Sequence, residues 1–301
     1  MKAADETPGT PLLPSLRHAA NDTLARAAQS LEAAAGQPDP ATAIHDFRVA
    51  MKRWRALLRL LQGIVGDETV MLRRQAGRLA RPLGRSRDAQ AALTALEDLS
   101  ASDTAPATMQ AAAARLNDIR KDSERAALDP ATLQRLRAGL ARAAEACANW
   151  PLDTVAFDDI AEALTRSYRR ARRRMPADWD AATAGDIHAF RKAVVIFRYQ
   201  METVEPLWPR LMRAYTSEAQ KLRMRLGRSN DLLVLENFLR PRRPLASWRK
   251  RLVAPLQARR RRHLAAAALL AARVFADKPR MFRQRLTTLG RAAALPQPPA
   301  A

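Results

Sequence analysis

Apolar residues recur along most of this chain at the three- and four-residue spacing of an α-helix, as at Leu57, Leu58 and Leu61. Residues that favour helices (Ala, Leu, Arg, Gln and Glu) dominate, and glycine occurs only 10 times. The alternation of β-branched and aromatic residues that marks strands is nearly absent. The pattern predicts an all-α fold.

Clusters of glycine, proline and aspartate interrupt the helical pattern at regular intervals. They predict about a dozen helices, two of them longer than about 25 residues. The interruptions fall at residues 36–40, 63–66, 82–84, 103–107, 129–130, 150–151, 175–180, 206–209, 241–244 and 277–279.

Two sequence motifs occur twice, each time at the same separation. IHDFRVAMKRWR begins at Ile44 and IHAFRKAVVIFR at Ile187, while LGRSRD begins at Leu83 and LGRSND at Leu226. The offset is 143 residues in both cases, without a gap. Two motifs that share one offset predict an internal duplication into two similar helical halves, about residues 8–150 and 151–296.

The first motif places basic residues on one face of a helix. His45, Arg48, Lys52 and Arg55 follow the spacing i, i+3, i+7, i+10, and the second copy reads His188, Arg191, Val195 and Arg198. Phe47 and Leu58 lie off this stripe and are expected to pack inward. A solvated arginine face would give the same pattern for a single residue, but the His and both Arg positions occur in both copies. The stripe therefore favours a binding site for an anion.

The second motif, LGRS(R/N)D, predicts a sharp junction between two helices. Glycine suits the end of one helix, serine the N-cap of the next and aspartate its first turn; these are Gly84, Ser86 and Asp88, with Gly227, Ser229 and Asp231 in the second copy. Basic residues accompany the junction. Arg78 aligns with Lys221 and Arg85 with Arg228, whereas Arg225 aligns with Pro82 and is unique to the second copy.

The net charge points to a phosphate-rich partner. The formal charge is +22, and the 52 basic residues comprise 45 arginines and 7 lysines. Arginine presents a planar fork of donors that suits phosphate oxygens, and a charge of this size attracts polyanions. Two further basic tracts, residues 168–175 and 258–264, are expected mostly as solvated helix faces.

Cysteine usage and hydropathy predict a cytoplasmic protein. Cys147 is the only cysteine, which excludes an intramolecular disulfide and a cysteine-rich metal site and suits a reducing compartment. The N-terminus lacks the apolar core of a signal peptide. The longest strongly apolar run, residues 264–272, is far shorter than the roughly 20 residues that span a membrane.

The pattern H-x-x-R-x-x-x-K-x-x-R, repeated once per half and followed by an LGxxxD junction, resembles the CHAD family (conserved histidine α-helical domain). The resemblance implies two helical bundles related by a pseudo-twofold axis, a basic surface that binds inorganic polyphosphate, and no catalytic activity. It carries the binding role to His45, Arg48, Lys52 and Arg55 in the first copy and to His188, Arg191 and Arg198 in the second. Val195 and Ile196 depart from the basic-rich family pattern, which predicts a weaker second half-site. No acidic ExExK segment precedes the domain, so a stand-alone domain is expected.

These observations together predict a cytoplasmic polyphosphate-binding protein that associates with polyphosphate granules and uses neither cofactor nor metal. Chain-length preference and oligomeric state stay open. The candidate polyphosphate-binding residues are His45, Arg48, Lys52, Arg55, Arg78, Arg85, His188, Arg191, Arg198, Lys221, Arg225 and Arg228.

Two other functions compete with this hypothesis. DNA and RNA present the same phosphates, so nucleic acid is an alternative or a weaker polyanion ligand, although single-strand binders usually add stacking aromatics. His45-Asp46 also resembles a metal-binding HD dipeptide or a phosphotransfer histidine. The second copy reads His188-Ala189, however, and the chain has only four histidines, so a phosphohydrolase or phosphotransfer role is disfavoured.

Overall fold

The computed structural model describes residues 13–37, 40–81, 83–100, 106–152 and 155–293. Throughout these ranges the regular structure is helical and no strand occurs, which confirms the predicted all-α class. None of the helices in these ranges is long and apolar enough to cross a membrane.

Twelve α-helices and two short 3₁₀ helices make up the described chain. Two of them exceed 25 residues, as predicted: α10 has 30 and α11 has 26. The elements are α1 (Leu13–Gly36), α2 (Ala41–Leu60), α3 (Gln62–Val65), α4 (Asp67–Leu79), α5 (Gly84–Ser100), α6 (Pro106–Ala127), α7 (Pro130–Ala148), α8 (Phe157–Arg174), α9 (Ala184–Met201), η2 (Glu202–Leu207), α10 (Pro209–Phe238), η3 (Ala246–Trp248), α11 (Arg249–Val274) and α12 (Pro279–Ala293).

Local sequence signals account for several helix starts. Thr183 and Asp186 form a capping box at the start of α9, in which Thr183 Oγ1 accepts from the Asp186 N–H at 3.2 Å. Asp129 caps α7 by accepting from the Thr132 N–H at 2.9 Å, and Pro130 occupies the first turn. These residues satisfy backbone donors that would otherwise lack partners.

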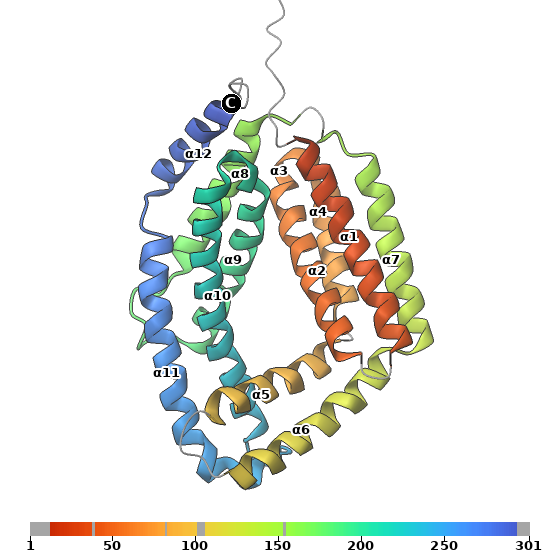
Figure 1. The fold of residues 1–301 in the computed structure, drawn as a ribbon, viewed down its shortest axis with the longest axis vertical. Helices are drawn as coiled ribbons and strands as arrows, with labels where there is room; N and C mark the ends of the chain where they lie inside the picture. Colours follow the sequence, from red (N-terminus) through yellow and green to blue (C-terminus); the bar gives the residue numbers. More distant parts are fainter. Residues whose placement is uncertain (1–12, 38–39, 82, 101–105, 153–154, 294–301) are drawn as a thin grey trace, which may run out of the picture.

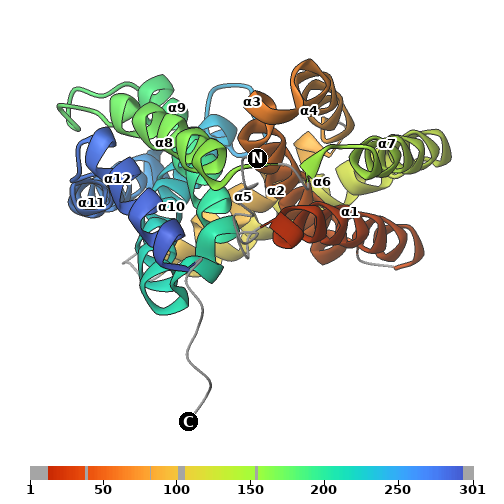
Figure 2. The ribbon, with the colours of Figure 1, turned by 90° about the horizontal axis from the view of Figure 1, so that it is seen from above.

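The helices form two columns, which α5 and α6 bridge at the lower end of the view (Figure 1). One column holds α1, α2, α4 and α7, and the other holds α8 to α12. Helices α5 and α6 cross between the columns at one end, and the view from above shows α2 near the centre (Figure 2). The two columns contact each other directly through α2 and α9, where Gln200 Nε2 donates to the Ala56 carbonyl at 2.8 Å.

Two hydrophobic clusters fix this arrangement. The larger one includes the buried faces of α2 and α9, with Phe47 and Trp54 on the first helix and Phe190 and Phe197 on the second. The smaller one joins α5 and α6 to α10 and α11 through leucines such as Leu96 and Leu235. One face of α2 and of α9 is buried in the core, so the opposite, basic face of each helix points away from the core.

The order of helices agrees with the offset of 143. Shifted by that number, α2 would cover residues 184–203, where α9 runs from 184 to 201, and α6 would cover 249–270, where α11 runs from 249 to 274. A duplication would produce this agreement. The pseudo-twofold axis and the boundaries near residues 150 and 151 stay predictions, and the outermost residues of both halves, before 13 and after 293, lie outside the described chain.

The predicted helix junction is present in the first copy and absent in the second. Helix α4 ends at Leu79 and α5 begins at Gly84, but α10 runs without a break through Gly227 and Ser229, so the prediction of a junction there was wrong. The first copy has Pro82, which lacks an N–H and disfavours a helical residue before it, where the second copy has Arg225. Without proline, α10 continues, and Gly227 and Ser229 are buried within it. In the first copy, Ser86 lies inside α5 rather than at its N-cap.

Candidate anion-binding site

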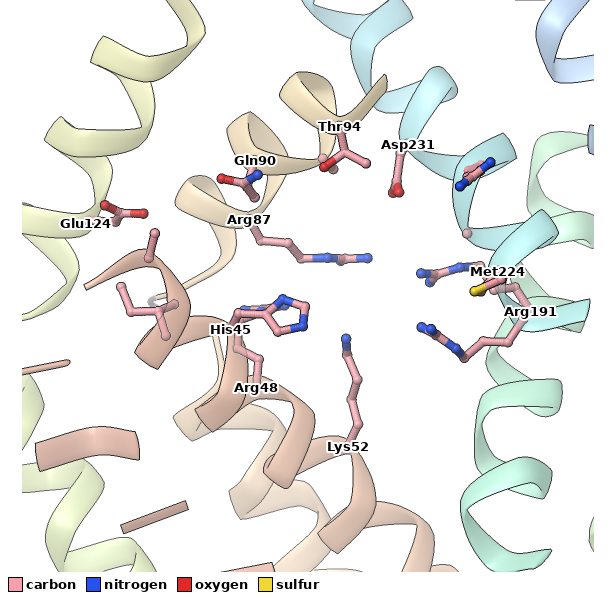
Figure 3. A pocket seen from close by; sticks show the side chains of 16 residues that line it. His45, Arg48, Lys52, Arg87, Gln90, Thr94, Glu124, Arg191, Met224 and Asp231 are labelled. Atoms are coloured by element: carbon pink, nitrogen blue, oxygen red, sulfur yellow. The ribbon is translucent and has the colours of Figure 1, made fainter. Parts of the chain in front are cut away.

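A cavity of about 260 Å³ lies between α2, α5, α9 and α10. Figure 3 shows the side chains around it. Its lining contains cationic or titratable nitrogen groups from both halves of the chain: His45, Arg48, Lys52, Arg87, Arg191, Arg223 and Arg228. The end groups of Lys52, Arg87 and Arg191 point into the same central space from three different helices (Figure 3).

Helix α2 supplies three of these side chains from its basic face. Its opposite face is anchored by Trp54, which is buried and stacks on Trp150 with ring centroids 5.8 Å apart. Arg48 is held in place because its Nη1 donates to the carbonyls of Ala80 at 3.3 Å and Leu83 at 2.9 Å, next to the start of α5. The α2 stripe is therefore fixed against both the core and the neighbouring chain segment.

The cavity concentrates positive charge in partly buried positions. Burial, reinforced by the neighbouring Arg87, Arg191, Arg48 and Arg223, lowers the pKa of Lys52 to about 7. Burial and Arg87 lower the pKa of Arg48 to about 10, and burial is also the main reason that the pKa values of Arg191 and Arg223 are lowered. Anions that entered the cavity would offset this repulsion and restore the charged form of Lys52.

Two acidic residues also line the cavity. Burial raises the pKa of Asp231, against the opposing effect of Arg191. Glu124 accepts from Arg120 through both carboxylate oxygens at 3.1 Å. Among the described residues, no group of three or more His, Cys, Asp or Glu is placed to hold a metal ion.

Comparison with known proteins identifies the family. The CHAD domain family matches residues 18–240, which is most of the chain. The chain belongs to the CHAD family. Its fold is similar to the crystal structure of the CHAD domain from the plant Ricinus communis, with a TM-score of 0.62 and 22% sequence identity over 94% of this chain and 95% of that one. No curated protein matches the sequence.

The second copy of the CHAD motif contributes less to the cavity than the first. Arg191 lines the cavity, but His188 and Arg198 do not. His188 Nδ1 lies 3.3 Å from Asn230 Oδ1. Arg198 donates to Glu202 at 2.6 Å, and its guanidinium lies 4.1 Å from the centre of the Tyr199 ring. Arg198 is thus neutralised by its own surroundings.

The other candidate residues are dispersed around the molecule. Arg55 and Arg78 are exposed and lie outside the cavity, and Lys221 donates to Glu218 at 2.6 Å. Arg225 Nη1 lies 3.4 Å from His263 Nδ1. Arg228 does line the cavity, with its Nη1 3.7 Å from Asp98 Oδ1. The backbone of Arg85 belongs to α5, but its side chain lies outside the described part of the structure.

Sequence reasoning missed two cavity arginines, Arg87 and Arg223. Under the offset of 143, Arg87 aligns with Asn230 and Arg223 with Ala80, so neither charge is repeated. A comparison of the two copies therefore gives no sign of either residue. The LGRSRD motif did contain a signal, because Arg87 follows the predicted junction directly.

Proposed function

We propose that this CHAD domain binds inorganic polyphosphate, with the cavity between α2, α5, α9 and α10 as the principal site. One observation carries the proposal: Lys52, Arg87 and Arg191 converge on one space, and none of the three forms an ion pair with a described residue. Partly buried charges without partners are costly, so such an arrangement is retained where a ligand compensates it.

The cavity lining favours a phosphate chain over a nucleic acid. Apart from the His45 imidazole, the described lining contains no aromatic ring on which a base could stack. A phosphate chain needs only cationic donors, which can engage it through charged hydrogen bonds. The proposal includes a binding role without catalysis and recruitment to polyphosphate granules.

A titration of the whole protein with long-chain polyphosphate tests the proposal. Because binding would release counterions, the affinity should fall steeply with salt, with a log–log slope on the order of −3 to −5 if about five cations are engaged. Single-stranded RNA at equal phosphate concentration should displace little of the polyphosphate. Efficient displacement by RNA would favour the nucleic-acid alternative instead.

Two further measurements test the rest of the proposal. Pure protein supplied with divalent metal should release no phosphate from polyphosphate, whereas release would point to an enzyme. A tagged copy should form foci only in cells that make polyphosphate; foci that persist without the polymer would mean that another component recruits the protein.

A further inference from the structure

A second group of arginines lies beyond the cavity, where α2 contacts both α4 and α8. We call Arg55, Arg59, Arg73 and Arg170 the α2–α4–α8 arginine cluster. The guanidinium carbon of Arg55 lies 4.0 Å from the position that a Cβ would take on Gly77 of α4. Arg73 Nη1 donates at 3.1 Å to Oε1 of Gln62, the first residue of α3, which contacts both α4 and α8. None of the four residues lines the cavity.

The cluster has no acidic partner. None of its four arginines forms an ion pair in the described part of the chain, and the Nε of Arg59 is buried without a hydrogen-bond acceptor. Burial and the charges of Arg170, Arg73, Arg55 and Arg174 lower the pKa of Arg59 to about 10. The pKa of Arg73 is lowered as well, mainly by burial and then by the charges of Arg55, Arg170 and Arg74. Four guanidinium groups therefore repel one another at this junction.

Three other arginines on or beside α8 differ from the cluster, because each has a carboxylate or backbone carbonyl partner. Glu162 on α8 forms ion pairs with Arg283 at 3.0 Å and with Arg166 at 3.8 Å. Arg172, also on α8, donates to the Phe275 carbonyl at 3.1 Å. Glu162 of α8 thus pairs with arginines outside the cluster.

Helix α2 connects the cavity to the cluster. Arg48, Lys52, Arg55 and Arg59 are spaced by four, three and four residues, which keeps them on one face of the helix. At a rise of 1.5 Å per residue, Arg48 and Arg59 are about 16 Å apart along the axis. A flexible phosphate chain that leaves the cavity along this face would meet Arg55 first, and then Arg59 with Arg73 and Arg170.

We propose that the α2–α4–α8 arginine cluster is a second phosphate subsite, which holds the outer part of a long polyphosphate chain while the cavity holds another part. This inference rests on the proposed function. It adds a physical basis for chain-length preference, since only a chain that reaches both subsites gains the second set of contacts without a second loss of translational freedom.

The test compares a long and a short phosphate polymer on the full-length protein. The cluster variant is Arg73→Gln with Arg170→Gln, and the matched control is Arg115→Gln with Arg240→Gln, two exposed arginines with the same loss of charge. Long-chain polyphosphate should bind the cluster variant about ten- to a hundredfold more weakly than the wild type, because two charged contacts are lost. The tight-site affinity for tripolyphosphate, which the cavity determines, should change no more than in the control. Without ligand, the cluster variant should unfold at the same temperature as the wild type or higher, because repulsion is removed.

Other outcomes of this experiment would overturn either the proposed function or the second subsite alone. If the wild type binds no long-chain polyphosphate, the proposed function fails and the second subsite fails with it. If the wild type binds but the cluster variant matches the control, only the second subsite is overturned. Equal weakening of tripolyphosphate and long-chain binding would also overturn it, because the arginines would then act on the cavity rather than as a separate subsite.

Discussion

Helices α2 and α9 carry the same motif but present different chemistry to the cavity. On α2, His45, Arg48 and Lys52 all reach the lining, whereas on α9 only Arg191 does so. Two positions make the difference: Val195 stands where α2 has Lys52, and His188, the counterpart of His45, lies 3.3 Å from Asn230 Oδ1 and outside the lining. A motif repeated in the sequence therefore does not place the same cationic groups in the cavity from both helices.

The largest effect is expected when two cavity cations of the first half, which form no ion pair with a described residue, are reversed in charge. In Lys52→Glu with Arg87→Glu, two charged contacts are lost and two repulsions appear. Polyphosphate affinity should fall by about 3–6 kcal/mol, or roughly 10²- to 10⁴-fold at low salt. Titration with long-chain polyphosphate measures the loss of affinity, and circular dichroism checks that the variant is folded.

Arg115→Glu with Lys121→Glu provides the control for the charge reversal. Both residues are exposed on α6 and outside the cavity lining, and the change in net charge is the same. The control should lose less than about tenfold in affinity, through the weakened long-range field alone. An equal loss in both variants would mean that diffuse charge, rather than the cavity, holds the polymer.

A second test separates the two arginines of α9. Arg191→Gln should weaken binding by about 1.5–3 kcal/mol, because it removes one unpaired cation from the cavity. Arg198→Gln should leave affinity within about twofold but reduce the free energy of unfolding by roughly 1–3 kcal/mol, since it leaves Glu202 without its closest partner. Polymer titration and denaturant unfolding of both variants distinguish the roles; a reversed pattern would refute the comparison.

Lys52 should make binding depend on pH. Its pKa is about 7 in the free protein, and a bound polyanion would raise it, so binding takes up a proton above pH 7. Affinity should be nearly constant below that pH and fall by up to about tenfold per unit as the pH rises from 7 towards the pKa of the bound state. Lys52→Met should bind more weakly and show a flat profile between pH 7 and 9. A wild-type profile equally flat over that range would contradict the role of Lys52.

The free protein should show the opposite trend in stability. The folded state depresses the pKa of Lys52 from 10.5 to about 7, so between these values the unfolded chain binds more protons than the folded one. The Lys52 contribution to the free energy of unfolding therefore rises with pH in this window, by at most about 1.4 kcal/mol per unit. The difference between wild type and Lys52→Met in denaturant unfolding at several pH values isolates this contribution.

Periodicity alone predicted much of this molecule. The spacing of apolar residues located the helices, and the i, i+3, i+7 pattern selected Arg48 and Lys52. Pairing in three dimensions was harder to predict. Glu202 lies four residues after Arg198, and that spacing does signal an ion pair, but the shared motif suggested equivalence instead. Arg223 had no such signal, because the position that aligns with it under the offset of 143 is Ala80, so its charge is not repeated.

The smallest effect is expected at Arg78 and Lys221, which align under the offset of 143 and were candidate binding residues in both copies. Both are exposed and outside the cavity lining, and Lys221 already has Glu218 at 2.6 Å. Arg78→Gln and Lys221→Gln should each change polyphosphate affinity by less than about twofold, because exposed charges at this distance are largely screened at physiological salt. Titration at low and physiological salt measures the change. A loss at either position as large as that for Arg191→Gln would place the ligand outside the cavity and along the flanks of α4 or α10.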